Sequence, residues 1–239
     1  GQSEFVFQSG DNVCYIGNTL ADRMQHYPWL ETYLTQANAD KEITFRNLGF
    51  SADEIKTRPR SANFGSPDQW LTKCNASVVF CFFGYNEALR GVTGLPQFES
   101  DLALAIDQMS AQKYNGQSAP RLAFFSPIAH ENLNSPNLPD GKANNANLKL
   151  YTEAMKRVCD QKNVPFYDLF TISNQLYENS DVPLTMNGIH LTDHGNKELA
   201  KAIAPVLSPG KPLPSENDIA DLHSAVTDKN YHWFSRYRV

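Results

Sequence analysis

Four short segments of the chain carry polar groups that could support chemistry. One contains Thr19 and another contains His190, while side-chain amides recur in all four. A hydroxyl, an imidazole and a group that orients the imidazole are what nucleophilic acyl transfer requires. The residue types therefore allow such a reaction if the fold brings the segments together. The segments are residues 17–20 (Gly-Asn-Thr-Leu), 47–53 (Asn-Leu-Gly-Phe-Ser-Ala-Asp), 84–87 (Gly-Tyr-Asn-Glu) and 187–191 (Asn-Gly-Ile-His-Leu).

The elements expected around these segments alternate along the chain. Apolar runs predict strands at residues 13–17, 43–48, 76–84, 121–126 and 164–169. Spacings of three and four predict helices at 19–34, 98–109, 147–161 and 191–207, and residues 51–54 are typical of a helix start. This alternation predicts an α/β fold, a doubly wound three-layer sandwich with a central parallel sheet. Ligands bind beyond the carboxyl ends of such strands, where the first three segments are expected.

The four segments, in this order, resemble the blocks of the SGNH (GDSL-type) hydrolases, a family of esterases and lipases. That family has Gly-Asp-Ser-Leu after its first strand and Asn-x-x-x-Ser-Gly-Asp after its second. It has Gly-x-Asn-Asp after its third strand and Asp-x-x-His before its last helix. The resemblance covers roughly residues 5–207. Four blocks in register with the strand pattern are a specific signal for the fold.

The resemblance implies a role for each matching position. Thr19 stands where the family has its serine nucleophile, His190 where it has its base, and Asn187 where it has the aspartate that orients that base. The oxyanion hole corresponds to the backbone N–H groups of Thr19 and Ala52 together with the Asn86 side chain. Further residues beside these positions are expected to line the substrate pocket: Asn18, Tyr85 and Glu87.

The departures from the family pattern weaken the expected catalysis. The extra methyl of Thr19 crowds the attack path and stiffens χ1, although threonine nucleophiles exist. Asn187 can accept a hydrogen bond from His190 but supplies no negative charge to an imidazolium. The same replacement in a serine protease costs on the order of 10⁴ in rate. The oxyanion donors are better preserved, since Ala52 keeps its backbone N–H and Asn86 keeps its amide.

Each position also has an ordinary structural interpretation. Thr19 can cap the first turn of a helix, and His190 can be a partly buried histidine at the start of the last helix. Asn187 with Gly188 can form a plain turn, as can Asn86 after its strand. Tyr85 can belong to the core.

Three functions remain open on the sequence. The first is an esterase-like hydrolase acting on small O-acyl esters, such as acetylated carbohydrate, through an acyl-enzyme. The second is a catalytically inactive module that keeps the pocket and binds a carbohydrate or acyl ligand within a longer protein. The third is a shifted chemistry in which Glu87 or Asp53 is the working carboxylate, which requires a carboxylate that faces His190.

Composition limits the partners and cofactors that the chain can have. The chain has 239 residues and a net charge of -5 without a basic run, which argues against a nucleic-acid partner. The sequence contains no apolar stretch of about 18 residues, so no transmembrane helix is predicted. We expect no metal or cofactor. The four cysteines show no zinc-type spacing and are expected as buried free thiols, with a Cys74–Cys159 disulfide as the alternative.

The expected domain organisation is one α/β domain over residues 1–207, then a proline-rich linker and a C-terminal helix over 208–239. The chain is expected to continue into a neighbouring domain after residue 239. No signal peptide is visible, and a leader could have been removed before Gly1. The sequence does not determine the cellular localisation, although it slightly favours a secreted or periplasmic protein.

Overall fold

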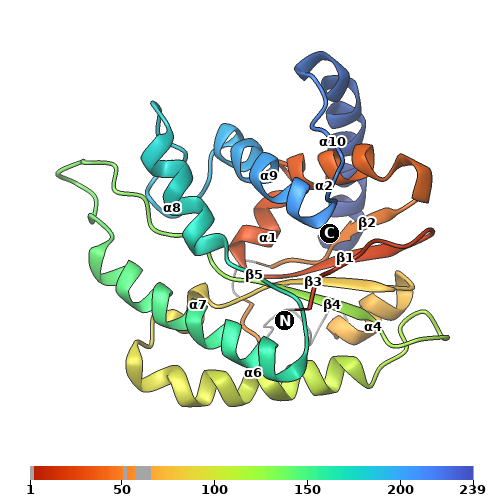
Figure 1. Ribbon diagram of the computed structural model, residues 1–239, viewed down its shortest axis with the longest axis horizontal. Helices are drawn as coiled ribbons and strands as arrows, with labels where there is room; N and C mark the ends of the chain where they lie inside the picture. The colour runs from red at the N-terminus through yellow and green to blue at the C-terminus, as the bar shows by residue number, and fades with distance from the viewer. Residues whose placement is uncertain (1–2, 51–52, 57–65, 239) are drawn as a thin grey trace.

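The computed structural model describes residues 3–50, 53–56 and 66–238. Its centre is a parallel sheet of five strands in the order β2-β1-β3-β4-β5 (Figure 1). The strands are β1 Asn12–Gly17, β2 Thr44–Asn47, β3 Val78–Phe82, β4 Arg121–Phe125 and β5 Phe166–Tyr167.

Helices cover both faces of the sheet, which confirms the expected doubly wound α/β fold. In Figure 1, α6 and α7 lie on one face, while α1, α2, α9 and α10 lie on the other. The described helices are α1 Thr19–Met24, α2 Trp29–Ala37, α4 Pro67–Lys73, α5 Tyr85–Ala88, α6 Leu95–Ser110, α7 Lys142–Lys162, α8 Leu169–Asn179, α9 Asp193–Leu207 and α10 Glu216–Arg238, with 3₁₀ turns η1 Ala39–Lys41 and η2 Val92–Gly94.

The central strands are apolar without interruption because both of their faces are buried. In β3, Val79 and Cys81 belong to the core on the α6–α7 side, while Phe80 and Phe82 belong to the core on the α2–α9 side. All five residues of β3 are buried. A strand in the middle of a parallel sheet has no polar face, which is why β3 shows the strongest strand signal in the sequence.

Several boundaries differ from those expected. The single helix predicted over 19–34 is two helices, α1 and α2, because the chain turns before Pro28 and a proline cannot continue a helix. Residues 53–56 are not helical, and Ser51 and Ala52 lie outside the described residues. The last strand is two residues long, and α7 begins at Lys142 instead of residue 147, directly after Gly141 in a left-handed conformation.

The C-terminal helix α10 packs against α2 and β2. Lys229 forms an ion pair with Glu31 of α2, and the indole N–H of Trp233 donates to the backbone oxygen of Asn47 at 2.9 Å. Ile219 and Val226 are buried. The aromatic C-terminal segment therefore contacts the sheet edge of this domain.

All four cysteines are free thiols, so the Cys74–Cys159 disulfide is not formed. Among the described helices, none is both long and apolar enough to cross a membrane. No group of three or more potential metal ligands occurs in the part of the chain that the structure describes.

Candidate active site

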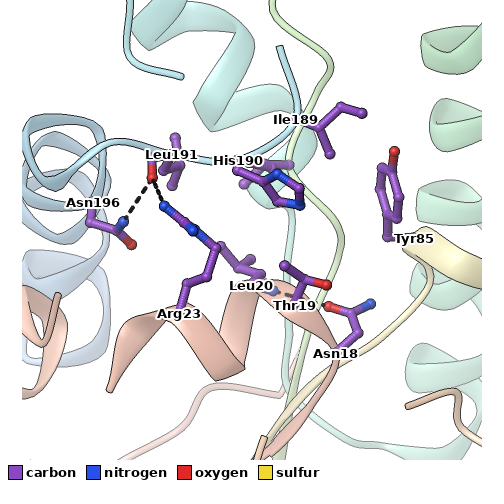
Figure 2. Close-up of a pocket in the computed structure, with 10 residues that line it drawn as sticks. Asn18, Thr19, Leu20, Arg23, Tyr85, Ile189, His190, Leu191 and Asn196 are labelled. Carbon is purple, nitrogen blue, oxygen red and sulfur yellow. Dashed lines mark hydrogen bonds between the residues drawn. The ribbon is translucent and has the colours of Figure 1, made fainter. Parts of the chain in front are cut away.

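A small pocket, with a cavity volume of about 40 Å³, opens where α1, α5 and the segment before α9 meet (Figure 2). Four residues predicted from the sequence line it: Asn18 and Thr19 of the first segment, Tyr85 of the third and His190 of the fourth. Its lining residues are Asn18, Thr19, Leu20, Arg23, Tyr85, Ile128, Ile189, His190, Leu191 and Asn196. The fold therefore brings segments far apart in the sequence to one place.

The turn between β1 and α1 positions Thr19. Gly17 has φ +142°, and a Cβ there would lie 2.1 Å from the backbone oxygen of Phe82. The Asn18 N–H donates to that same oxygen at 3.1 Å. The strand end is thus pressed against β3, which only glycine allows. This close approach sets where α1 starts.

Asn18, and not Thr19, caps α1. The Asn18 side-chain oxygen accepts from the Leu20 N–H at 3.3 Å, while Thr19 is the first residue of the helix. Figure 2 shows the Thr19 side chain beside Asn18, with the His190 imidazole directed toward it from the other wall of the pocket. The structural role that the sequence left open for Thr19, capping α1, is therefore filled by Asn18.

The turn at residues 187–190 positions His190. The Asn187 Oδ1 accepts from the backbone N–H of Ile189 at 3.0 Å and of His190 at 2.9 Å. Its Nδ2 lies 2.9 Å from His190 Nδ1. Gly188 has φ +89°, which the turn requires. Asn187 is therefore a turn residue and also the group that contacts the imidazole.

This arrangement decides which nitrogen of His190 carries the proton. Because Oδ1 of Asn187 is held by two backbone N–H groups, the amide nitrogen faces Nδ1 and donates to it. Nδ1 is then an acceptor, so the proton of the neutral ring resides on Nε2. Burial, followed by the positive charge of Arg23, lowers the pKa of His190, so the ring is neutral at pH 7. The resting imidazole presents an N–H donor on Nε2.

A buried carboxylate that the sequence analysis missed holds this turn. Glu131 is 6% exposed and accepts from the backbone N–H of Leu184 and from both the N–H and the hydroxyl of Thr185. The Thr185 hydroxyl in turn accepts from the Gly188 N–H at 2.9 Å. Glu131 lies in an irregular Asn- and Pro-rich loop, where no local pattern distinguishes it from a solvated acid.

The third segment lies outside the pocket wall except for Tyr85. Asn86 donates from Nδ2 to the backbone oxygen of Asp53 at 3.4 Å. Glu87 is 4% exposed and accepts from the N–H groups of Gly84 and Ile55, at 3.2 and 3.0 Å. Neither Asn86 nor Glu87 belongs to the pocket lining. Glu87 thus ties the start of α5 to residue 55 and does not face the pocket.

Two further expectations concern residues around this segment. Ala52, the expected backbone donor, lies outside the described residues. No carboxylate among the described residues contributes to the pKa shift of His190. The shifted chemistry through Glu87 or Asp53 requires a carboxylate that faces His190, so it gains no support here.

Arg23 is a charged pocket residue that the sequence analysis missed. It lies one helical turn after Thr19, so its spacing of four places it on the same side of α1. One Nη donates to the backbone oxygen of Leu191 at 2.9 Å, and the guanidinium lies 5.4 Å from the centre of the Tyr27 ring. It brings a positive charge to the pocket wall.

The model of the GDSL-like lipase/acylhydrolase family matches residues 15–198. This span contains Thr19, His190 and all of the parallel sheet except the first three residues of β1, and the chain belongs to that family. No curated protein matches the chain by sequence.

Solved structures of other enzymes share the fold at low identity. A catalytic mutant of Axe2, an acetylxylan esterase from Geobacillus stearothermophilus, is 15% identical with a TM-score of 0.66, over 88% of this chain and 99% of that one. LAE5, an α/β hydrolase enzyme from the metagenome of Lake Arreo in Spain, is 16% identical with a TM-score of 0.61, over 84% and 96%. BT4096, a gut microbial diltiazem-metabolizing enzyme, is 16% identical with a TM-score of 0.60, and the match covers 84% of this chain and 47% of BT4096.

Proposed function

We propose that the protein hydrolyses small O-acyl esters at a low rate, with Thr19 as nucleophile and His190 as base. The observation that carries this proposal is that Thr19 and His190, which are 171 positions apart, line one pocket. Membership of an acylhydrolase family supports the reaction type. The likeness to an acetylxylan esterase supports acetylated carbohydrate as the first substrate class to examine.

The proposed reaction has two steps. The Thr19 hydroxyl attacks the ester carbonyl and passes its proton to Nε2 of His190, which then protonates the departing alcohol. Water, activated by the same nitrogen, attacks the acyl-Thr19 ester and releases the carboxylic acid. The backbone N–H groups of Thr19 and Ala52, with the Asn86 amide, are the proposed oxyanion donors, and Asn86 must then leave the Asp53 oxygen.

The Asn187 contact explains why the proposed rate is low. A base needs a lone pair on Nε2, whereas the amide of Asn187 favours the tautomer that has a proton there. To reverse this, Asn187 would have to give up its hydrogen bonds to the backbone N–H groups of Ile189 and His190. The equivalent loss of the orienting acid costs on the order of 10⁴ in a serine protease, and catalysis persists.

The same contact favours a second candidate, a module that binds an acyl ligand without hydrolysing it. With Nε2–H as a donor, His190 can hydrogen-bond a carbonyl or carboxylate oxygen of a ligand. Most of the pocket wall is apolar, and binding of an acyl ligand there does not require a nucleophile. In this alternative Thr19 contributes a hydroxyl for binding.

The test is hydrolysis of p-nitrophenyl acetate and of acetylated xylo-oligosaccharide by the wild type and by Thr19→Ala. Thr93→Ala is the matched control, because Thr93 is exposed and lies outside the pocket lining. We expect slow turnover that Thr19→Ala abolishes and Thr93→Ala keeps. Turnover that is absent in the wild type, or that survives Thr19→Ala, rejects Thr19 as nucleophile and favours the binding module.

A further inference from the structure

We infer that the pocket is a binding site for a short-chain carboxylate, which accepts a hydrogen bond from His190 and is attracted by the charge of Arg23. This inference concerns the same pocket as the proposed function. It does not require that Thr19 act as a nucleophile, because it is a statement about binding.

The first argument is the charge of the pocket wall. Arg23 lines the pocket together with His190, and no aspartate or glutamate occurs among the described lining residues. Within the described part of the chain, Arg23 forms no ion pair, and its Nε is buried without a hydrogen-bond acceptor. A partly buried cation without a counter-charge is unfavourable, and an anion in the pocket would relieve this.

The second argument is the direction of the hydrogen bond that His190 offers. Asn187 holds the proton on Nε2 of the neutral ring, and Figure 2 shows the ring directed into the pocket toward Thr19. A carboxylate only accepts hydrogen bonds, so it suits Nε2–H and the Thr19 hydroxyl as donors. Hydrogen bonds to an ionised acceptor are roughly twice as strong as those between neutral groups. The donors and the charge therefore favour the same ligand group.

The third argument is the remainder of the wall, which is mostly apolar although Asn18 and Asn196 also line it. A cavity of about 40 Å³ with aliphatic side chains in its wall suits a short alkyl chain better than a second charged group. The side chains concerned are Leu20, Ile128, Ile189 and Leu191. A small monocarboxylate presents both parts, a carboxylate for the polar side and an alkyl tail for these residues.

The test compares butyrate with butyramide, a neutral molecule of nearly the same shape. Calorimetric titration and the His190 ring-proton NMR signals report binding directly, without any turnover. We expect butyrate to bind at least about tenfold more tightly than butyramide. Equal affinity of the two molecules for the wild type would overturn the inference without the need for any variant.

Variants then assign the preference to Arg23. Arg23→Met should bring the butyrate-to-butyramide ratio close to one, while Arg23→Lys keeps the charge and should retain part of the preference. Arg157→Met is the matched control, because Arg157 is an exposed arginine paired with Glu99 and does not line the pocket. An unchanged ratio in a folded Arg23→Met protein, as judged by circular dichroism, would contradict the role of Arg23.

These outcomes are separate from those of the proposed function. If the protein hydrolyses p-nitrophenyl esters, butyrate should inhibit competitively, since it occupies the acyl pocket. If it does not hydrolyse them, butyrate binding still stands or falls on the titration. Hydrolysis together with equal binding of butyrate and butyramide would support the proposed function and reject the carboxylate site.

Discussion

The two turns that form the pocket are positioned in different ways. The turn of Gly17 and Asn18 is set by a neighbouring strand, because it is pressed against the backbone of Phe82. The turn of Asn187 and His190 is held by Glu131, a buried carboxylate from a distant loop. The first turn follows from one glycine and two adjacent strands. The second depends on a long-range polar network, while the proton position on His190 is set inside the turn by Asn187.

The largest expected effect comes from Asn187→Asp in the second turn. One carboxylate oxygen can keep the two backbone N–H bonds while the other accepts from Nδ1–H, which frees the lone pair on Nε2. We expect ester hydrolysis to rise by about 10²–10⁴. The measurement is kcat for p-nitrophenyl acetate, together with ¹⁵N NMR of the His190 tautomer.

The double variant Asn187→Asp with Thr19→Ala is the control for that experiment. It should return to the background rate, since the nucleophile is gone. A single Asn187→Asp variant that moves the proton to Nδ1 without any gain in rate would show that the base is not what limits this site.

The first turn is broken most directly by Gly17→Ala. The new Cβ would lie 2.1 Å from the Phe82 oxygen, at φ +142°, so we expect a loss of at least about 3 kcal/mol in the free energy of unfolding. Gly116→Ala is the matched control, because Gly116 has φ +74° but no atom within 4 Å, and it should cost only about 1 kcal/mol. Urea unfolding of both variants measures the difference, and equal losses would show that contact with β3 is unimportant.

The network of the second turn is tested by Glu131→Gln. Glutamine offers one acceptor oxygen where the carboxylate offers two, and it loses the negative charge that strengthens the hydrogen bonds to residues 184 and 185. We expect a loss of about 2 kcal/mol in the free energy of unfolding, measured in urea. Glu153→Gln is the control, since Glu153 is exposed on α7, and it should change little. Similar losses in both variants would argue against a special role for Glu131.

The smallest effect links the two turns through Arg23. The pKa of His190 is lowered by burial and then by Arg23 of α1, so an NMR titration should give a midpoint below the ordinary value of about 6.5. Arg23→Met should raise that midpoint, because it removes a positive charge next to the ring. A midpoint that does not respond would show that Arg23 is not electrostatically coupled to His190.

The same shift predicts a pH dependence of stability. Between the lowered pKa and about 6.5, the folded protein binds fewer protons than the unfolded chain. Stability should therefore fall as pH drops through about 6.5, and this contribution should level off below the pKa of the folded protein. The pKa of His130 is also lowered by burial and acts in the same direction. Unfolding midpoints measured at several pH values, in the wild type and in His190→Gln, give the contribution of His190 to the pH dependence of stability.

Much of the fold could be predicted because its signals are local. The buried strands β1, β3 and β4 are short apolar runs, and glycine marks the turn at the end of β1. The four polar segments stand in family order, so Thr19 and His190 could be assigned to one site from the sequence, and both line the pocket. Helix ends were less predictable, since the break between α1 and α2 depends on where the chain turns before Pro28.

By itself, the sequence determined the class of fold, the order of the strands and helices, and the two side chains that meet across the pocket. The orientation of the Asn187 amide is set within its own turn, because its oxygen accepts from the backbone N–H groups of Ile189 and His190. Tertiary structure decided that this turn lies opposite Thr19 across the pocket. Tertiary structure also decided that Glu131 holds the turn at residues 187–190 and that Arg23 brings a positive charge to the pocket wall. Apolar periodicity can be read along the chain, whereas the partners of a polar group are defined only once distant segments have packed together.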